Sequence, residues 1–486
     1  MHANPKTRRD APMPASHATI SLPSTSVACP AMERLRQFLE GRRTAPPVTD
    51  LEGFERELHA LFAAAECEAM GQELARLDVD IPVILVDGVA HRRVVRCEET
   101  YVGGAGPMRV MRSLYSTRRD DEPAVCPMEL RAGIVEGRWT PLAARQAAWV
   151  VAHLTPQEGE DLFGMLGGMK PSKSSLDRLP KQVSERWEAE RERFEDALRK
   201  GEMVPKEAAS VAVSIDGVMV PMKDGEREEK RARAKADGKH QRGPAGHQEV
   251  GCATLSLYDA EGERLKTIRL ARMPEPKKAT LKVALAAELS AVLTQRPDLA
   301  VTKLADGAKD NWEYFTEMSP PSPQVVDFFH AAEHLKTALA AAYGETSPKT
   351  NAQFEKLRLV LRDDDDGVEK VIRSLAYLRD EHPGRKKIAT ELRYFRSNRH
   401  RMRYAWMKAQ NLPIGSGVVE AACKTLATQR LKRSGMRWRH QGGQAILTLR
   451  ALAQSGDRFD RAWAMLAATY RRDVTLPDNV IDLRLK

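Results

Sequence analysis

Short apolar runs that lead into acidic residues mark the second half of the chain. The run VAVSIDG, broken only by one serine, ends at Asp216 and a glycine. Such a run, bounded by an Asp-Gly pair, predicts a buried strand that places a carboxylate at its open end. The run AVTKLADGA has the same character and contains Asp306, again followed by glycine. The stretch IGSGVVE predicts instead a glycine-rich turn that opens a helix carrying Glu420.

The pattern between these stretches predicts alternating strands and helices. Strands are expected at 211–217, 252–258, 266–270, 300–304 and 324–328, and helices at 277–294 and 330–342. A further helix is expected between the last two strands. The resulting order, three strands followed by helix-strand units, is similar to that of a ribonuclease H-like fold. In this order Asp216 lies on the first, central strand and Asp306 directly follows the fourth.

The remaining periodicity predicts several further modules. The expected organisation is a disordered N-terminus (1–30), a mixed module (31–135), a helix-turn-helix-like module with a connector helix (136–205), the first part of the core (206–346), an all-helical insertion (347–412), the final core helix with Glu420 (413–455), and a C-terminal tail (456–486). The sequence thus predicts an α/β protein whose ribonuclease H-like core follows mainly helical N-terminal modules.

Short helices joined by glycine-containing turns predict the helix-turn-helix-like module, with a third helix that ends near Pro180 and a connector helix at 185–199. In a helix-turn-helix the last helix enters the major groove of DNA, where Lys173 and Arg178 would meet phosphates or bases. Plain helical hairpins fit the same pattern, so both interpretations stay open.

Charge and composition narrow the class of partner. The chain has 486 residues and a formal net charge of +10, which favours a polyanionic partner such as nucleic acid, although a merely basic surface has the same charge. No apolar run approaches the roughly 20 residues of a membrane span. Six scattered cysteines form no CxxC pair, which predicts reduced thiols in a cytoplasmic protein.

Three carboxylates on separate elements suit two hard cations, magnesium or manganese. Asp216 would bridge both ions, and Asp306 and Glu420 would each hold one, which is the ligand set of two-metal phosphodiester chemistry. A single Asp-Gly at a strand end is ordinarily only a turn. Two such pairs followed by a glycine-opened helix with Glu420 favour the metal site.

A competing motif lies at residues 330–334, HAAEH, which is also a signature of one class of zinc peptidases. Histidines four residues apart share a helix face and can hold zinc. The third ligand is not evident in the sequence, so the histidines are expected instead to pack near the acidic site.

A run of cations follows Glu420 and favours contact with phosphates: Lys424, Arg430, Lys432, Arg433, Arg437 and Arg439. For Lys424 the alternative is an ordinary ion pair with Glu420, four residues earlier on the same helix face. Trp438, among these cations, is expected either to stack on a base or to belong to the core. The basic residues of loop 223–248 contact nucleic acid or form a solvated insertion.

Four segments resemble DDE-type insertion-sequence transposases, most closely the ISKra-type bacterial elements related to the Mutator-like group: SIDGVMVPMKDG, LADGAKDNW, VVDFFHAAEHL and IGSGVVEAACKTLATQRLKRSGMRW. From first to last they span about half of the chain, in the family's order. The resemblance implies a triad of Asp216, Asp306 and Glu420. It also implies that Asp327 and His330 match the family's supporting motif near the site.

The resemblance implies magnesium-dependent transposition that acts on the element's own terminal inverted repeats and on target DNA. It implies a homo-oligomer, a dimer or larger, that brings two ends together, and a location with the nucleoid in a bacterial cytoplasm. Two other functions stay open, a zinc peptidase that uses residues 330–334 and a non-catalytic DNA-binding protein derived from a transposase.

Overall fold

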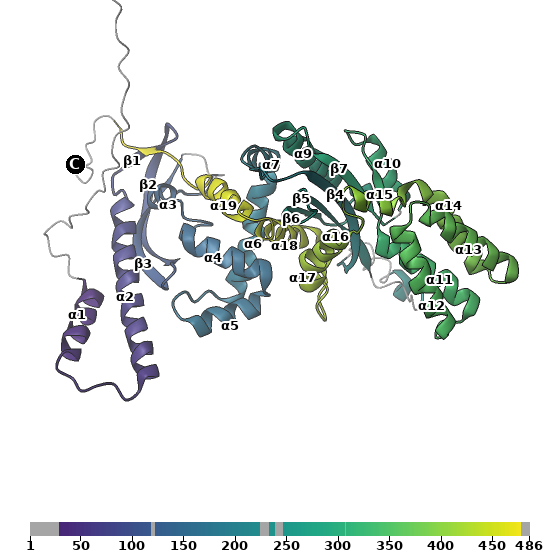
Figure 1. Ribbon diagram of the computed structural model, residues 1–486. Helices are drawn as coiled ribbons and strands as arrows, with labels where there is room; N and C mark the ends of the chain where they lie inside the picture. Colours follow the sequence, from purple (N-terminus) through teal and green to yellow (C-terminus); the bar gives the residue numbers. More distant parts are fainter. Residues whose placement is uncertain (1–28, 118–121, 224–232, 239–245, 307, 478–486) are drawn as a thin grey trace, which may run out of the picture. The chain divides into compact units, whose positions relative to one another are not determined.

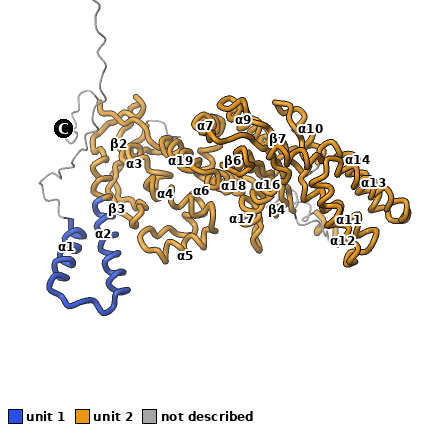
Figure 2. Tube along the Cα trace, in the orientation of Figure 1, with its two compact units in different colours: residues 1–69 blue, residues 70–486 orange. Residues whose placement is uncertain are grey.

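The computed structural model describes residues 29–117, 122–223, 233–238, 246–306 and 308–477 (Figure 1). The chain is a mixed α/β protein with two sheets, and it divides into two compact units, residues 1–69 and 70–486 (Figure 2). The segment predicted as disordered, 1–30, lies outside the described residues except for its last two. No helix within the described ranges is long and apolar enough to cross a membrane.

The first unit contains α1 (Pro30–Arg42) and most of α2 (Leu51–Leu77), which continues into the second unit. Apolar side chains of the two helices pack together, with Leu35 buried among them. The rings of Phe38 and Phe54 stack with their centroids 5.7 Å apart. This pairing buries some of the apolar side chains of the two helices, whereas others, such as Phe62, stay exposed.

The smaller sheet is antiparallel, with the strand order β3-β2-β1-β9. Its strands are β1 (Val83–Val86), β2 (Val89–Val102), β3 (Pro107–Ser116) and β9 (Val474–Thr475). An Asp-Gly pair with positive φ at both residues forms the tight turn between β1 and β2, as the twist of a two-residue hairpin requires. The short helix α3 (Pro127–Ala132) follows β3. Because β9 comes from the C-terminal segment, residues far apart in sequence complete this sheet.

Four helices follow, each with an identifiable start: α4 (Pro141–His153), α5 (Pro156–Leu166), α6 (Lys173–Ala189) and α7 (Arg191–Lys200). The hydroxyls of Thr140, Thr155 and Ser172 cap the first three, and Thr155 forms a full capping box with Glu158.

The third helix does not end near Pro180, and no separate connector helix spans 185–199. Helix α6 continues through Pro180 to Ala189, and α7 starts two residues later. The apolar stripe of α6 extends past the proline and includes Val183 and Trp187, both buried. Burial of this stripe offsets the roughly 3 kcal/mol that an internal proline costs a helix.

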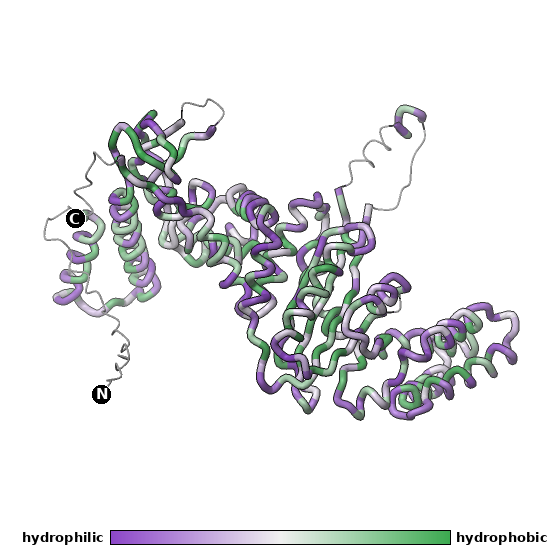
Figure 3. The backbone as a smooth tube through the Cα atoms, turned by 90° about the horizontal axis from the view of Figure 1, so that it is seen from above, coloured by the Kyte–Doolittle hydropathy of each residue, from purple (hydrophilic) through white to green (hydrophobic). Residues whose placement is uncertain are grey.

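The larger sheet has the strand order β6-β5-β4-β7-β8. Its strands are β4 (Ser210–Pro221), β5 (His247–Tyr258), β6 (Arg264–Arg272), β7 (Ala300–Ala305) and β8 (Gln324–Val326). Strands β4, β5 and β6 pair antiparallel, whereas β4, β7 and β8 pair parallel. Strands β4 and β5 contain long apolar stretches, and Figure 3 shows the hydropathy along the backbone. The helices that link the parallel strands are α9 (Ala279–Gln295), entered through a short 3₁₀ turn (Pro276–Lys278), and α10 (Lys309–Glu317).

Both faces of this sheet are covered. Side chains alternate between faces along β4, so Val213 and Ile215 pack in one cluster with Leu285 of α9. The other face contributes Cys252 to a cluster with Cys423 and further side chains from the C-terminal helices. The side chain of Asp216 lies on this second face, because it is opposite Cys252 in the β4–β5 register.

Helix α11 (Phe328–Tyr343) leads into the segment predicted as an all-helical insertion. That segment consists of α12 (Pro348–Asp363), α13 (Gly367–Glu381), α14 (Lys386–Asn398), a 3₁₀ turn (Arg399–Arg401) and α15 (Tyr404–Ala409). The acidic run at 363–366 is tied by ion pairs, for example Asp364 and Asp366 with Lys370 at 2.8 Å.

The segment predicted to hold a single final helix is broken into several pieces: α16 (Gly417–Ala422), a π-helical turn (Cys423–Thr428), α17 (Gln429–Leu431) and α18 (His440–Ala453). Gly435, with a φ of 75°, lies in the turn that separates α17 from α18. The described part of the predicted C-terminal tail is built into the fold, because α19 (Arg458–Ala468) packs in one cluster with α4, α6 and α7 and is followed by β9.

Candidate functional site

The pairing of β4 with β7 sets the positions of two predicted site residues. The last paired residues are Ser214 on β4 and Leu304 on β7. Asp216 and Asp306 lie two residues further along these parallel strands, so the register brings both to the same level of the sheet. They are close enough for the charge of Asp306 to act on Asp216.

Asp216 lies in an unfavourable place for a negative charge. Burial raises the pKa of its carboxyl above the ordinary value of 3.8, and the charge of Asp306 raises this pKa further. The N–H of Gly217 donates to Oδ1 at 2.6 Å and opposes the shift. Two neighbouring carboxylates that repel each other form a place where a cation is favoured.

Asp306 is held by local contacts at the start of α10. Its Oδ1 accepts a hydrogen bond from the N–H of Ala308 at 3.1 Å and lies 3.5 Å from the amide nitrogen of Asn311. Within the described part of the chain, Oδ2 of Asp306 accepts no hydrogen bond.

Glu420 lies on α16, with its side chain exposed. Its Oε1 accepts a hydrogen bond at 2.7 Å from the hydroxyl of Ser416, the residue that precedes the helix. Asp327 ties this helix start to α11, because one carboxylate oxygen accepts from the N–H of Ser416 and the other accepts from the N–H of His330 at 2.5 Å. The buried Asp327 is therefore the residue that anchors the segment bearing Glu420.

A thiol that the sequence did not single out contacts Asp216. Cys423, three residues after Glu420, places Sγ 3.6 Å from Oδ2 of Asp216. Cys252 lies opposite Asp216 in the β4–β5 register and shares a hydrogen bond with Cys423. This bond, and then burial, raises the pKa of the Cys423 thiol.

The three predicted carboxylates are thus only partly assembled. Asp216 and Asp306 lie at the same level of adjacent strands, whereas Glu420 is bonded to Ser416. Within the described ranges, no group of three or more His, Cys, Asp or Glu residues is arranged to hold a metal ion.

The histidines of α11 lie beside this cluster and have structural partners. The Nε2 atoms of His330 and His334 are 3.2 Å apart, and Nδ1 of His334 pairs with Glu391 of α14 at 2.5 Å. Tyr394 stacks on His334 with 3.7 Å between ring centroids, and its hydroxyl lies 3.5 Å from the carbonyl oxygen of Asp306. The third ligand that the peptidase alternative needs is absent from the described residues.

The predicted phosphate-contacting residues differ in environment. Those exposed to solvent are Lys424, Lys432, Arg437, Arg439, Lys173 and Arg178. Arg433 is half-buried and pairs with Glu158 at 2.5 Å, and Arg430 is buried. Trp438 is half-buried against the core and donates from Nε1 to a backbone carbonyl, which favours its structural role. Most of loop 223–248 lies outside the described residues.

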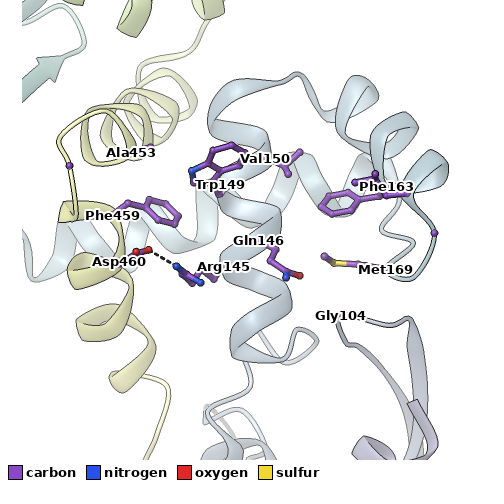
Figure 4. Close-up of a pocket in the computed structure, with 13 residues that line it drawn as sticks. Gly104, Arg145, Gln146, Trp149, Val150, Phe163, Met169, Ala453, Phe459 and Asp460 are labelled. Atoms are coloured by element: carbon purple, nitrogen blue, oxygen red, sulfur yellow. Dashed lines mark hydrogen bonds and ion pairs between the residues drawn. The ribbon is translucent and has the colours of Figure 1, made fainter. Parts of the chain in front are cut away.

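A separate cavity of about 580 Å³ lies among α4, α5 and α19 (Figure 4). Its walls include Trp149 and Phe163, and Arg145 pairs with Asp460 at 2.5 Å on its rim. None of the predicted site residues lines it.

Comparison with known proteins gives little further information. No protein-family model and no curated protein matches the chain. Among solved structures, the chain is similar to a Drosophila P element transposase strand transfer complex, with 13% sequence identity and a TM-score of 0.25. The match covers 68% of this chain and 81% of the other. A likeness this distant carries no argument about fold or function.

Proposed function

We propose that this chain is a DNA transposase that cleaves at the ends of its mobile element and joins the freed 3′-hydroxyl to target DNA. The observation that carries the proposal is the pair of neighbouring carboxylates, Asp216 and Asp306, at the same level of adjacent parallel strands. The strand order of the larger sheet supports it, because three antiparallel strands extended by two parallel ones is the order expected of a ribonuclease H-like core. The four motif segments named above add the third acid, Glu420.

Asp216, Asp306 and Glu420 offer the hard oxygen donors that magnesium or manganese prefers. A bound cation would relieve the repulsion that acts on Asp216, and Glu420, which is bonded to Ser416, would add a third carboxylate to the ligands. Two such ions supply activation of the attacking oxygen and stabilisation of the leaving oxygen in phosphodiester chemistry.

Other residues of the chain would position these groups. Asp327 fixes the start of α16, and Ser416 holds the Glu420 carboxylate through its hydroxyl. The Cys423 thiol donates to Asp216 and favours its ionised form, which is the form that binds a cation. Exposed cations such as Lys424 would neutralise phosphates of the bound strand.

The test is a magnesium-dependent nicking and strand-transfer assay on DNA that carries the sequence flanking the gene. Asp216→Ala and Glu420→Gln should each lower activity by about 100-fold or more, the scale of losing one transition-state electrostatic contact. Binding to the same DNA should remain, because neither residue is a basic contact.

A matched control is Asp310→Asn, which removes an acid four residues from Asp306 that pairs with Lys282 at 3.2 Å. This variant should retain most of its activity. Full activity in Asp216→Ala would refute the assignment of the site. Binding without nicking in the unmodified chain would favour the non-catalytic alternative, and stoichiometric zinc lost in His334→Ala would favour the peptidase.

A further inference from the structure

A small cavity of about 190 Å³ lies between α6 and the segment that follows α17. Its charged and aromatic lining residues are Asp177, Lys181, Arg430, Arg437 and Trp438. The cavity is smaller than the roughly 300–1,000 Å³ of sites for drug-sized ligands, which suits a group the size of a phosphate. Two of the residues predicted to contact phosphates, Arg430 and Arg437, line this cavity together with Lys181 of α6.

Arg430 has a buried guanidinium without a hydrogen-bond partner among the described residues, which the fold itself does not explain. The residue is 2% exposed, and its guanidinium lies 5.3 Å from the centroid of the Trp438 ring. Its Nε has no hydrogen-bond partner, and within the described ranges no oxygen accepts a hydrogen bond from the guanidinium. A buried charge of this kind is costly unless it is paired.

The other buried arginines of the described residues all have partners. Arg272 pairs with Glu188 and Glu195, and Arg458 pairs with Glu202 and Glu288. Arg450 donates to backbone carbonyls, including that of Ala152 at 2.5 Å. Arg430 is therefore the exception, and an anion that enters the cavity would supply its partner.

The charges around Arg430 also favour an anion. Burial lowers the pKa of Arg430 to about 10, and the nearby Arg450 and Arg433 lower it as well. The two acids close enough to oppose this effect are engaged elsewhere, since Glu158 pairs with Arg433 and Asp177 pairs with Lys181 at 2.5 Å. The two arginines therefore affect the pKa of Arg430 more strongly than the two acids do.

We propose that this cavity binds one backbone phosphate of a DNA strand, with the guanidinium of Arg430 as its anchor. The planar fork of an arginine matches two phosphate oxygens, and the Trp438 ring beside it restricts its movement. Exposed Arg437 and half-buried Lys181 lie at the same cavity and would contact the flanking part of the strand. The choice of DNA as the source of the phosphate rests on the proposed function.

The first experiment measures the affinity of the full chain for duplex DNA over a range of salt concentrations. Arg430→Met should weaken binding about 10-fold and make the dependence of log K on log salt shallower by roughly 1, the loss of one phosphate contact. Its melting temperature should be unchanged or higher, because the substitution removes an unpaired buried charge. The matched control is Arg373→Met, which removes an exposed arginine of α13 and should leave DNA affinity unchanged.

The second experiment uses inorganic phosphate as the probe in thermal unfolding. Phosphate should raise the melting temperature of the unmodified chain and have a smaller effect on Arg430→Met. Equal DNA binding and equal phosphate protection in both chains would overturn the proposal. If the unmodified chain binds no DNA, the DNA source fails together with the proposed function, and protection by phosphate that requires Arg430 would still support an anion pocket.

Discussion

Asp216 carries an electrostatic cost that its neighbours only partly remove. Burial and the charge of Asp306 both raise the pKa of its carboxyl, so the ionised form destabilises the fold at neutral pH when no cation is bound. Sites that perform chemistry often keep such strained charges, because the same arrangement binds the cation that the reaction needs.

Asp216→Asn should therefore raise the free energy of unfolding at pH 7 in the presence of a chelator. The expected gain lies within the ~0.5–2 kcal/mol of ordinary stabilising substitutions. Because the pKa of Asp216 is raised in the folded state, its ionised carboxylate destabilises the fold fully at pH values above that pKa. This destabilisation vanishes below the unfolded pKa of 3.8, so the stability gained by Asp216→Asn should vanish there too. Urea unfolding between pH 3 and 7 measures this difference in the free energy of unfolding. Asp310→Asn should show no gain, and a loss of stability in Asp216→Asn would contradict the argument.

The site residues differ in how far sequence could predict them. Asp216 and Asp306 follow apolar runs and precede glycine, a local signal that one strand carries by itself. Cys252 faces Asp216 only through the register between two strands, and Glu391 reaches His334 from a different helix. Contacts of this kind depend on tertiary pairing, which apolar spacing does not specify.

At the scale of elements, a buried lysine holds the connection between β7 and β8. Lys303 lies on β7, 1% exposed, three residues before Asp306. Its Nζ donates to the backbone carbonyls of Phe315, Met318 and Pro320 at 2.9, 2.5 and 2.9 Å. The ammonium thus satisfies carbonyls at the end of α10 that would otherwise be unpaired.

Lys303→Met should lower the free energy of unfolding by about 2–4 kcal/mol, because it leaves these buried carbonyls without donors. It should also lower nicking activity, since the end of β7 positions Asp306. Lys309→Met is the control: its side chain is almost fully exposed, and its loss should change stability by less than about 0.5 kcal/mol. Equal stability of the two variants in urea unfolding would show that the lysine does not hold this connection.

Helices and strands were predicted correctly where the spacing of apolar residues alone determines them. The prediction failed where tertiary packing outweighs a local signal such as a proline. The strand around Asp216 and the helix that carries His330 lie where the pattern placed them. Pro180 predicted a helix end, yet α6 continues because Val183 and Trp187 complete its buried stripe. The helix with Glu420 includes a π-helical turn, which the sequence does not reveal.

At the scale of the whole second unit, the C-terminal elements pack against elements from the first part of that unit. The last helix, α19, packs in one cluster with α4, α6 and α7, and β9 completes the smaller sheet beside β1. Sequence patterns predicted separate modules and a tail, because they describe neighbours along the chain and not the partners that buried side chains find. Cooperative unfolding of residues 70–486 is the expected consequence.

Arg458 is the charged residue that joins α19 to the larger sheet and to its helices. Its guanidinium bonds Glu288 of α9 through both terminal nitrogens, at 2.8 and 2.7 Å, and bonds Glu202 at 2.6 Å. Burial alone would raise the pKa of Glu202, but Arg458 and Lys266 outweigh it and hold that pKa below the ordinary value of 4.5. The bonds therefore stabilise the fold fully above pH 4.5, and their contribution is lost as pH falls through the folded pKa.

Arg458→Met should leave two carboxylates buried without this partner and lower the free energy of unfolding by about 3–5 kcal/mol at pH 7. The difference from the unmodified chain should shrink below pH 4.5, because protonation then removes the unpaired charges. Arg145→Met, which removes an exposed pair with Asp460, should cost less than about 1 kcal/mol. Urea unfolding at pH 4 and 7 measures these values, and a loss below 1 kcal/mol in Arg458→Met would mean that apolar packing alone joins the C-terminal helix to the sheet.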